Sequence, residues 1–300
     1  MARTSTEVVR ACLAELARAW LDKESPALAG EPDAVHQMRV TSRRLRALLR
    51  VWGPALGAHT VSVADELWWV AHALGEVRDL EVLEQRLLDG AGAGSSGAEL
   101  AGLTRASIDA QLERARAELE ADFGSRRFAS IRVAVQDLGS ARMAHGWKRA
   151  PADRLVKLTH ARCRAALRSW DRVGLAPGLE PRPDQLEALH HARRVAKSAR
   201  YVSEALGSQG ISGSRRRLAA LGSPEAWGWA LREVADALGR VQDSVVAERY
   251  LRWLAEGADA GPAAGLVTLA DREARERRTA LRESFRAVAA AREVIGPGRA

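Results

Sequence analysis

The sequence carries the same pair of helical motifs twice, and this duplication limits the folds that the chain can adopt. The pattern H-x-x-R-x-x-x-[RK]-x-x-R begins at His36 and again at His190. Downstream of each copy the sequence reads A-L-G-x-V-x-D-x-x-V, first from Ala73 and then from Ala237. The copies are separated by about half of the 300 residues, which predicts a duplicated helical bundle rather than a solenoid of short repeats.

The rest of the chain is also typical of helices. Ala, Leu, Arg and Glu are strong helix formers, and no segment alternates as a β-strand does. The hydrophobic content of 47% is sufficient for a real core. We therefore predict an all-α protein with halves at residues 1–148 and 149–300. Breaks rich in Gly, Pro and Ser separate the expected helices, which lie near residues 6–23, 35–52, 60–88, 99–122, 124–138, 153–170, 184–206, 224–256 and up to 294, with a glycine-rich linker at 90–97.

The first copy of the motif lies in an amphipathic helix. Apolar residues recur at helical spacing on one side of it, whereas the other side is cationic. We call this cationic side the first basic stripe; it consists of His36, Arg39, Arg43, Arg46 and Arg50. At about 100° per residue these side chains fall within a sector of roughly 80°. No carboxylate at i±4 offsets their mutual repulsion, so the stripe predicts a binding surface for an anion.

The second copy repeats the same offsets with fewer charges. The second basic stripe consists of His190, Arg193, Lys197 and Arg200. Glu204 occupies the position that matches Arg50, so this stripe is shorter and partly self-neutralised. The preceding helix adds cations within a sector of roughly 40°, which predicts a groove that is more basic on the side of the second half. These added cations are Lys157, Arg164 and Arg168.

The second motif supplies small and acidic residues near the stripes. Gly75 and Gly239 lower helix stability where they stand, so close helix packing is the predicted reason for them. Asp79 and Asp243 are each expected to orient an arginine of the adjacent stripe. A net charge of +8 indicates an anionic partner. The excess is rich in arginine, which suits contacts to phosphate.

Other features of the sequence favour simple interpretations. No phosphate-binding G-x-x-x-x-G-K-[ST] loop, H-E-x-x-H motif or Cys/His cluster occurs, so we expect no metal or cofactor. Cys12 and Cys163 are expected to be buried thiols in a reducing compartment. The nine tryptophans are expected to fill the core and the interface between bundles. No apolar run is long enough to cross a membrane and no leader is visible, which predicts a cytoplasmic protein. Arg215–Arg217 are expected to form a solvated loop.

These segments resemble the CHAD domain family. The two basic segments are V-H-Q-M-R-V-T-S-R-R-L-R and L-H-H-A-R-R-V-A-K-S-A-R-Y, and the later two are L-G-E-V-R-D-L-E-V and L-G-R-V-Q-D-S-V-V. The resemblance covers nearly the whole chain. It implies two antiparallel, four-helix-like bundles related by a pseudo-twofold axis, with basic helices facing a shared central surface. It also implies binding of inorganic polyphosphate through both basic stripes, and association with polyphosphate granules. Ser198 in place of a second Arg44, and Glu204, depart from an equal contribution of the two halves.

Three functions remain compatible with the sequence. The first is a non-catalytic polyphosphate-binding module, because a flexible polyanion without bases needs a basic groove and no aromatic platform. The second is a nucleic-acid-binding helical module that uses the same stripes. The third is a phosphohydrolase in which Asp79 and Asp243 hold a divalent metal. The acidic E-x-E-x-K signature of the triphosphate-processing domain that accompanies some CHAD domains is missing from this sequence.

Overall fold

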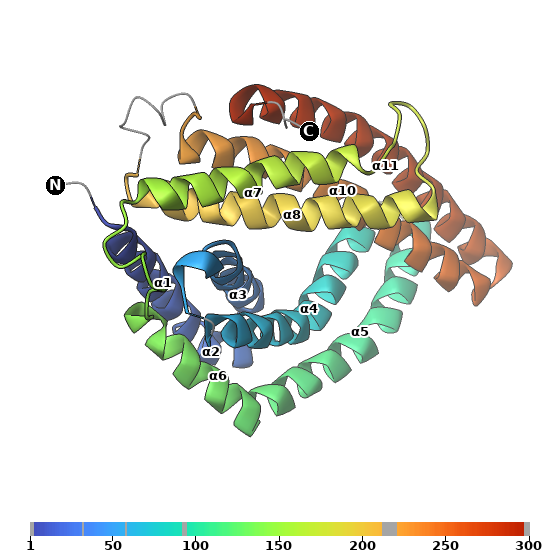
Figure 1. The fold of residues 1–300 in the computed structure, drawn as a ribbon. Helices are drawn as coiled ribbons and strands as arrows, with labels where there is room; N and C mark the ends of the chain where they lie inside the picture. Colours follow the sequence, from blue (N-terminus) through green and yellow to red (C-terminus); the bar gives the residue numbers. More distant parts are fainter. Residues whose placement is uncertain (1–2, 32, 58, 92–94, 212–220, 297–300) are drawn as a thin grey trace.

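The computed structural model describes residues 3–31, 33–57, 59–91, 95–211 and 221–296, and in these ranges the chain is all-α apart from two isolated β-bridges. The all-α prediction is therefore confirmed. Figure 1 shows how the helices are arranged. The first half contains α1 (Ser5–Leu21), α2 (Glu24–Leu28), α3 (Ala34–Val51), η1 (Gly53–Ala55), α4 (His59–Ala91), α5 (Ser95–Phe123), α6 (Arg126–Gln136) and η2 (Asp137–Ser140). The second half contains α7 (Asp153–Asp171), α8 (Pro183–Ser208), α10 (Pro224–Glu256) and α11 (Ala260–Ile295).

Local sequence signals account for several helix ends. Thr4 and Glu7 form a reciprocal capping box at the start of α1. α8 and α10 both begin at a proline, which fits the first turn because its missing N–H would have no partner there. Two boundaries differ from the prediction. The break expected after α1 contains the short helix α2, and the predicted linker at 90–97 is largely taken up by the ends of α4 and α5.

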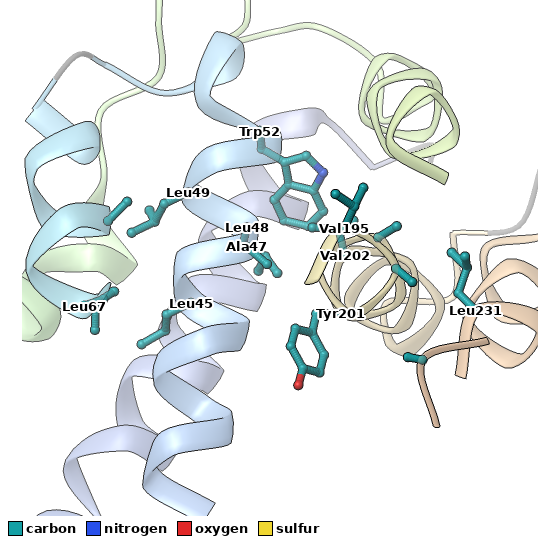
Figure 2. Packing of buried hydrophobic residues seen from close by; sticks show 14 of the residues in the cluster. Leu45, Ala47, Leu48, Leu49, Trp52, Leu67, Val195, Tyr201, Val202 and Leu231 are labelled. Carbon is teal, nitrogen blue, oxygen red and sulfur yellow. The ribbon is translucent and has the colours of Figure 1, made fainter. Parts of the chain in front are cut away.

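The helices that carry the two basic stripes meet at the centre of the molecule. In Figure 2, α3 runs up the view while α8 is seen nearly end-on, so the two helices cross. Ala47 and Leu48 of α3 face Val195 and Val202 of α8 there, and all four are buried. These residues belong to one hydrophobic cluster that includes residues of both halves. The division at residues 148 and 149 remains a prediction.

Buried tryptophans hold the stripe helices in place. Trp20 of α1 donates from Nε1 to Ser42 Oγ of α3 at 2.7 Å. Trp52, the residue that ends α3, donates from Nε1 to Thr159 Oγ1 of α7 at 3.2 Å. Both indoles are fully buried, and burial of a large apolar side chain contributes about 1.5–3 kcal/mol. The polar faces of α3 and α8 are therefore presented by helices with firmly packed apolar backs.

A second, smaller hydrophobic cluster joins the long helices away from the crossing. It draws on α4, α5, α10 and α11 through residues such as Leu87, Ile108, Leu251 and Leu266. Arg86 of α4 reinforces it, because its guanidinium lies 2.7 Å from the Glu273 carboxylate of α11. The two halves thus pack together at two separate places.

Candidate anion-binding site

The first arginine of each basic stripe contacts the A-L-G-x-V-x-D-x-x-V motif of the same half. In the first half, Arg39 donates from Nη1 to Asp79 Oδ1 at 2.8 Å and from Nη2 to Oδ2 at 3.3 Å. Its guanidinium lies over Gly75, where an added Cβ would be 3.1 Å from Nη2. The predicted orienting role of Asp79 is confirmed. The glycine makes room for a side chain, which differs from the predicted close approach of two helices.

The second half repeats this arrangement more loosely. The guanidinium of Arg193 lies over Gly239, with 3.5 Å from an added Cβ to Nη2, and 4.0 Å separates its Nη2 from Asp243 Oδ1. Arg39 and Arg193 are both mostly buried. In both halves the Nε atom is buried without a hydrogen-bond partner in the described part of the chain. Arg39 is therefore oriented by two hydrogen bonds and Arg193 by a weaker ion pair, while part of the donor capacity of each is unused.

Arg43 and Lys197 bring the two stripes together. Burial lowers the pKa of Arg43, and the neighbouring Arg39 and Arg193 lower it further. Burial, followed by the charges of Arg193 and Arg43, lowers the pKa of Lys197 from 10.5 to about 7. Within the described ranges neither Arg43 nor Lys197 has a carboxylate oxygen within 4.0 Å. We call Arg39, Arg43, Arg193 and Lys197 the central cationic cluster.

The two stripe histidines lie beside this cluster. Burial lowers the pKa of His36, and the charge of Arg78 lowers it further. Burial, followed by the charge of Arg194, lowers the pKa of His190, whose Nδ1 is buried without a partner in the described structure. Both rings are therefore neutral near pH 7 in the free protein. Direct contact of these rings with a ligand remains a prediction.

A cavity of about 620 Å³ opens next to the cluster, between α3, α7 and α8. We call it the α7-side cavity. No carboxylate lines it in the described part of the chain. Its charged and titratable lining consists of Arg43, Arg46, Arg50, Arg162, Arg194, Lys197 and His191. Arg50 is the member with an ion pair, since its guanidinium contacts Asp65.

Three of these lining residues were not predicted from the sequence. Arg162 projects from α7 and donates from Nε to Ser198 Oγ at 3.3 Å. His191 and Arg194 each follow a member of the second stripe and are therefore turned about 100° from it. The available signal was the adjacent pairs His190–His191 and Arg193–Arg194, which place cations on two faces of one helix.

The three cations predicted on α7 lie outside the α7-side cavity. Lys157, Arg164 and Arg168 are absent from the lining of the α7-side cavity. They share a helix face with Asp171, which forms an ion pair with Arg292 of α11. The cavity is instead faced by the side of α7 that holds Arg162. Ligand contacts from these three residues remain a prediction, and they would lie outside this cavity, because the pattern defined a polar face but not the neighbour that it meets.

Arg200, at the end of the second stripe, has its charge balanced by carboxylates. Its Nε donates to Glu204 Oε1 at 2.7 Å, and its Nη1 lies 3.6 Å from Asp236 Oδ1. Glu204 also accepts from Arg232 at 2.9 Å and from Arg44 at 3.4 Å. The predicted self-neutralisation of the second stripe is confirmed. A ligand contact from Arg200 remains a prediction that requires loosening of these pairs.

The tryptophans are divided between the interior and the surface. Trp20, Trp52 and Trp227 are fully buried, as predicted for core residues. Trp68 and Trp229 are more than half exposed, at 52% and 66%. A third exposed indole, that of Trp253, is 56% accessible. The prediction that all nine fill the core and interface is therefore wrong. α4 and α10 are too long for every apolar side chain along them to be covered by a neighbour.

Other predicted features are quickly placed. Cys12 and Cys163 are buried free thiols, and burial raises the pKa of each to about 12. Arg215–Arg217 lie outside the described residues. In the ranges that are described, no three His, Cys, Asp or Glu side chains are grouped so as to hold a metal ion. Every helix in those ranges is too short or too polar to cross a membrane.

Comparison with protein families identifies the architecture. The model of the CHAD domain matches residues 11–252. Two proteins of Mycobacterium tuberculosis, MT2285 of strain CDC 1551 / Oshkosh and Rv2226 of strain ATCC 25618 / H37Rv, are each 32% identical to the chain over 230 residues. Those alignments include 73% of this chain but 40% of either relative, so the chain spans less than half the length of these proteins.

Two solved structures share the fold. PptA from Streptomyces chartreusis superposes with a TM-score of 0.76 at 21% identity, covering 95% of this chain and 99% of that one. The CHAD domain from the plant Ricinus communis superposes with a TM-score of 0.63, also at 21% identity, covering 100% of this chain and 94% of that one. At this level of identity the likeness establishes the shared fold.

Proposed function

Because the chain belongs to the CHAD domain family, we propose that it binds inorganic polyphosphate without catalysis, along the two basic stripes and into the α7-side cavity. The observation that carries the proposal is the meeting of Arg43 and Lys197 from two duplicated helices, with no carboxylate oxygen within 4.0 Å of either in the described structure. Burying like charges together is costly unless a counter-charge arrives. A linear chain of phosphates supplies such charges at regular intervals and needs no base-reading contacts.

The geometry suits phosphate oxygens in particular. Two hydrogen bonds to Asp79 orient Arg39, and Arg193 lies 4.0 Å from Asp243. Each arginine retains a buried Nε donor without a partner among the described residues. Guanidinium groups form forked, charge-assisted hydrogen bonds to phosphate. We expect phosphate oxygens to take these donors and to contact Arg43 between them.

Calorimetry with long-chain polyphosphate tests the proposal. The double variant Arg43→Ala/Lys197→Ala should lose at least about tenfold in affinity, because each charged hydrogen bond contributes roughly 1.5–3 kcal/mol. The matched control is Arg114→Ala/Arg282→Ala, which removes two cationic side chains from exposed positions on α5 and α11. Affinity in wild type should fall steeply with salt concentration. Equal affinity in the variant and the control would contradict the proposal.

Competition separates polyphosphate from nucleic acid. A duplex DNA supplied at equal charge equivalents should fail to displace bound polyphosphate if the crossing of α3 and α8 fits only a slim chain. Complete displacement would favour the nucleic-acid-binding alternative. Release of orthophosphate in the presence of Mg²⁺ or Mn²⁺ would instead favour the phosphohydrolase that uses Asp79 and Asp243.

We further propose that binding directs the protein to polyphosphate granules in the cytoplasm. A fluorescent fusion of the wild-type chain should co-localise with stained granules, and the Arg43→Ala/Lys197→Ala fusion should be diffuse. Granule localisation that persists in the double variant would show that another contact recruits the chain.

A further inference from the structure

The duplication relates two pockets on either side of the crossing of α3 and α8. The second pocket, which we call the α1-side pocket, has a volume of about 160 Å³ and is lined by α1, α3 and α8. His36 and His190 lie 154 residues apart, and the same offset matches the helices position by position. Arg50, Val51 and Ser198 line the α7-side cavity, and their equivalents Glu204, Ala205 and Arg44 line the α1-side pocket. Tyr201 borders both. The two pockets are therefore pseudo-symmetric twins.

The α1-side pocket is closed by charge pairing. Glu204 replaces the cation that its twin position holds, and it gathers Arg44, Arg200 and Arg232 around its carboxylate at 2.7–3.4 Å. Burial opposes ionisation of this carboxyl, but the hydrogen bonds from Arg200 and Arg232 lower its pKa, so it stays charged near neutral pH. A second carboxylate, that of Glu15, also lines the pocket. A polyanion that enters here meets two carboxylates and arginines that are already paired with Glu204.

The α7-side cavity offers the opposite environment. Arg162 occupies the α7 wall, where its nearest polar partner is the neutral hydroxyl of Ser198. Burial and then Arg50 lower the pKa of Arg46, Asp65 raises it, and Arg194 is close enough to lower it further. Arg46, Arg162 and Arg194 have no carboxylate oxygen within 4.0 Å in the described parts of the chain. Arg162 and Arg194 both lie outside the duplicated stripe motif.

We propose that a bound polyphosphate chain extends from the central cationic cluster into the α7-side cavity alone. Arg162 and Arg194 are further binding residues, and Glu204 closes the α1-side pocket to the chain. The inference rests on the proposed function, since it assigns a direction to the same ligand. It accounts for the divergence of two pockets that arose from one repeated unit.

The first test removes the added cations. Arg162→Ala/Arg194→Ala should weaken binding of long-chain polyphosphate by at least about tenfold at moderate salt. It should also reduce the slope of log K against log salt by about 1–2, because two phosphate contacts are lost. The control is again Arg114→Ala/Arg282→Ala, which loses the same charge. If the cavity variant and the control bind equally well, the assignment of Arg162 and Arg194 is wrong.

The second test removes the negative charge of Glu204 from the α1-side pocket. Glu204→Gln keeps the shape of the side chain and removes its charge, so Arg44, Arg200 and Arg232 lose the carboxylate that pairs with them and can pair with phosphate instead. Affinity should rise, and the number of phosphate units covered per protein at saturation should increase. Glu118→Gln, at an exposed site on α5, is the matched control. A gain no larger than that of the control would overturn the closing role of Glu204.

The outcomes of the two sets of experiments are distinguishable. If wild type binds polyphosphate and Arg43→Ala/Lys197→Ala does not, the proposed function stands whatever Arg162→Ala/Arg194→Ala does. If that second variant then binds like wild type, only the directional inference fails. If wild type itself does not bind, the proposed function fails first. Circular dichroism and thermal unfolding of each variant exclude loss of the fold as the cause.

Discussion

Binding of polyphosphate should depend on pH through Lys197. The ammonium group is repelled by Arg193 of α8 and Arg43 of α3, and more weakly attracted by Asp243 and Asp236 of α10. His36 of α3 is close enough for the charge of Lys197 to act on it. Burial and the two guanidinium groups lower its pKa from 10.5 to about 7. Phosphate oxygens beside the amine would restore the charged form, so the bound state has the higher pKa. Affinity should therefore be highest below pH 7 and fall as the pH rises.

The size of the effect follows from linkage. If the bound pKa returns to its ordinary value, affinity should fall by about tenfold between pH 6 and pH 8 for a free pKa of about 7. Binding should take up about 0.9 proton at pH 8 and about 0.1 proton at pH 6. The lowered pKa values of His36 and His190 add a change in the same direction at acidic pH.

Calorimetry in buffers of different ionisation enthalpy measures this proton uptake directly. Long chains are the suitable ligand, because their internal phosphates stay ionised throughout this range. Lys197→Arg keeps the positive charge but does not titrate, so it should bind with little change between pH 7 and pH 8. Wild-type affinity that is constant from pH 6 to pH 8 would refute the reasoning, as would an equal pH dependence in Lys197→Arg.

Three further predictions concern the scaffold of the site. Gly75→Ala should raise helix stability by about 0.5–1 kcal/mol. It should nevertheless weaken polyphosphate binding by about 1 kcal/mol, because the new Cβ would lie 3.1 Å from the Arg39 guanidinium. Gly239→Ala, where the corresponding distance to Arg193 is 3.5 Å, should have a smaller effect in the same titration. Lys197 has a lower pKa in the folded state than in the unfolded state, so between these two pKa values the unfolded state binds more protons. The free energy of unfolding should therefore rise from pH 7 to pH 10. Chemical denaturation of Lys197→Met should show a smaller rise over the same range. Leu48→Ala, at a fully buried position of the crossing, should cost about 2–5 kcal/mol in the same assay, and a value below 1 kcal/mol would contradict the packing described.

Repetition made much of this fold predictable. Periodicity located α3 and α8 because each has an uninterrupted apolar face and a clear stop. The second motif predicted that Asp79 orients an arginine of the adjacent stripe, and the structure shows that this arginine is Arg39. The short helix α2 was missed, because Ser25 and Pro26 break α1 but are also compatible with a single helical turn.

The site was only partly predictable because a helical pattern defines faces and not neighbours. Arg164 and Arg168 share a well-defined polar face, yet that face lies on the side of α7 that meets α11. Arg162 stands alone in the sequence and becomes part of the site only because α7 packs against α8 with that side toward the cavity. Such a residue can be identified once the relative rotation of packed helices is known.

Uncompensated burial is a stronger indicator of the site than total charge. A net charge of +8 among 84 acidic and basic side chains is modest, and many arginines on the surface are paired with carboxylates. At the crossing of α3 and α8, by contrast, several buried cations lack a paired carboxylate in the described structure. They line the α7-side cavity and not its pseudo-symmetric counterpart, the α1-side pocket. Glu204 demonstrates that a carboxylate at this position is compatible with the fold, since it neutralises the twin pocket. Arg50 at the matching position is paired with Asp65, whereas Arg162 and Arg194 add like charge to the cavity without such a pair among the described residues. Such an arrangement costs stability in the free protein, and an anion bound on that side would offset the cost.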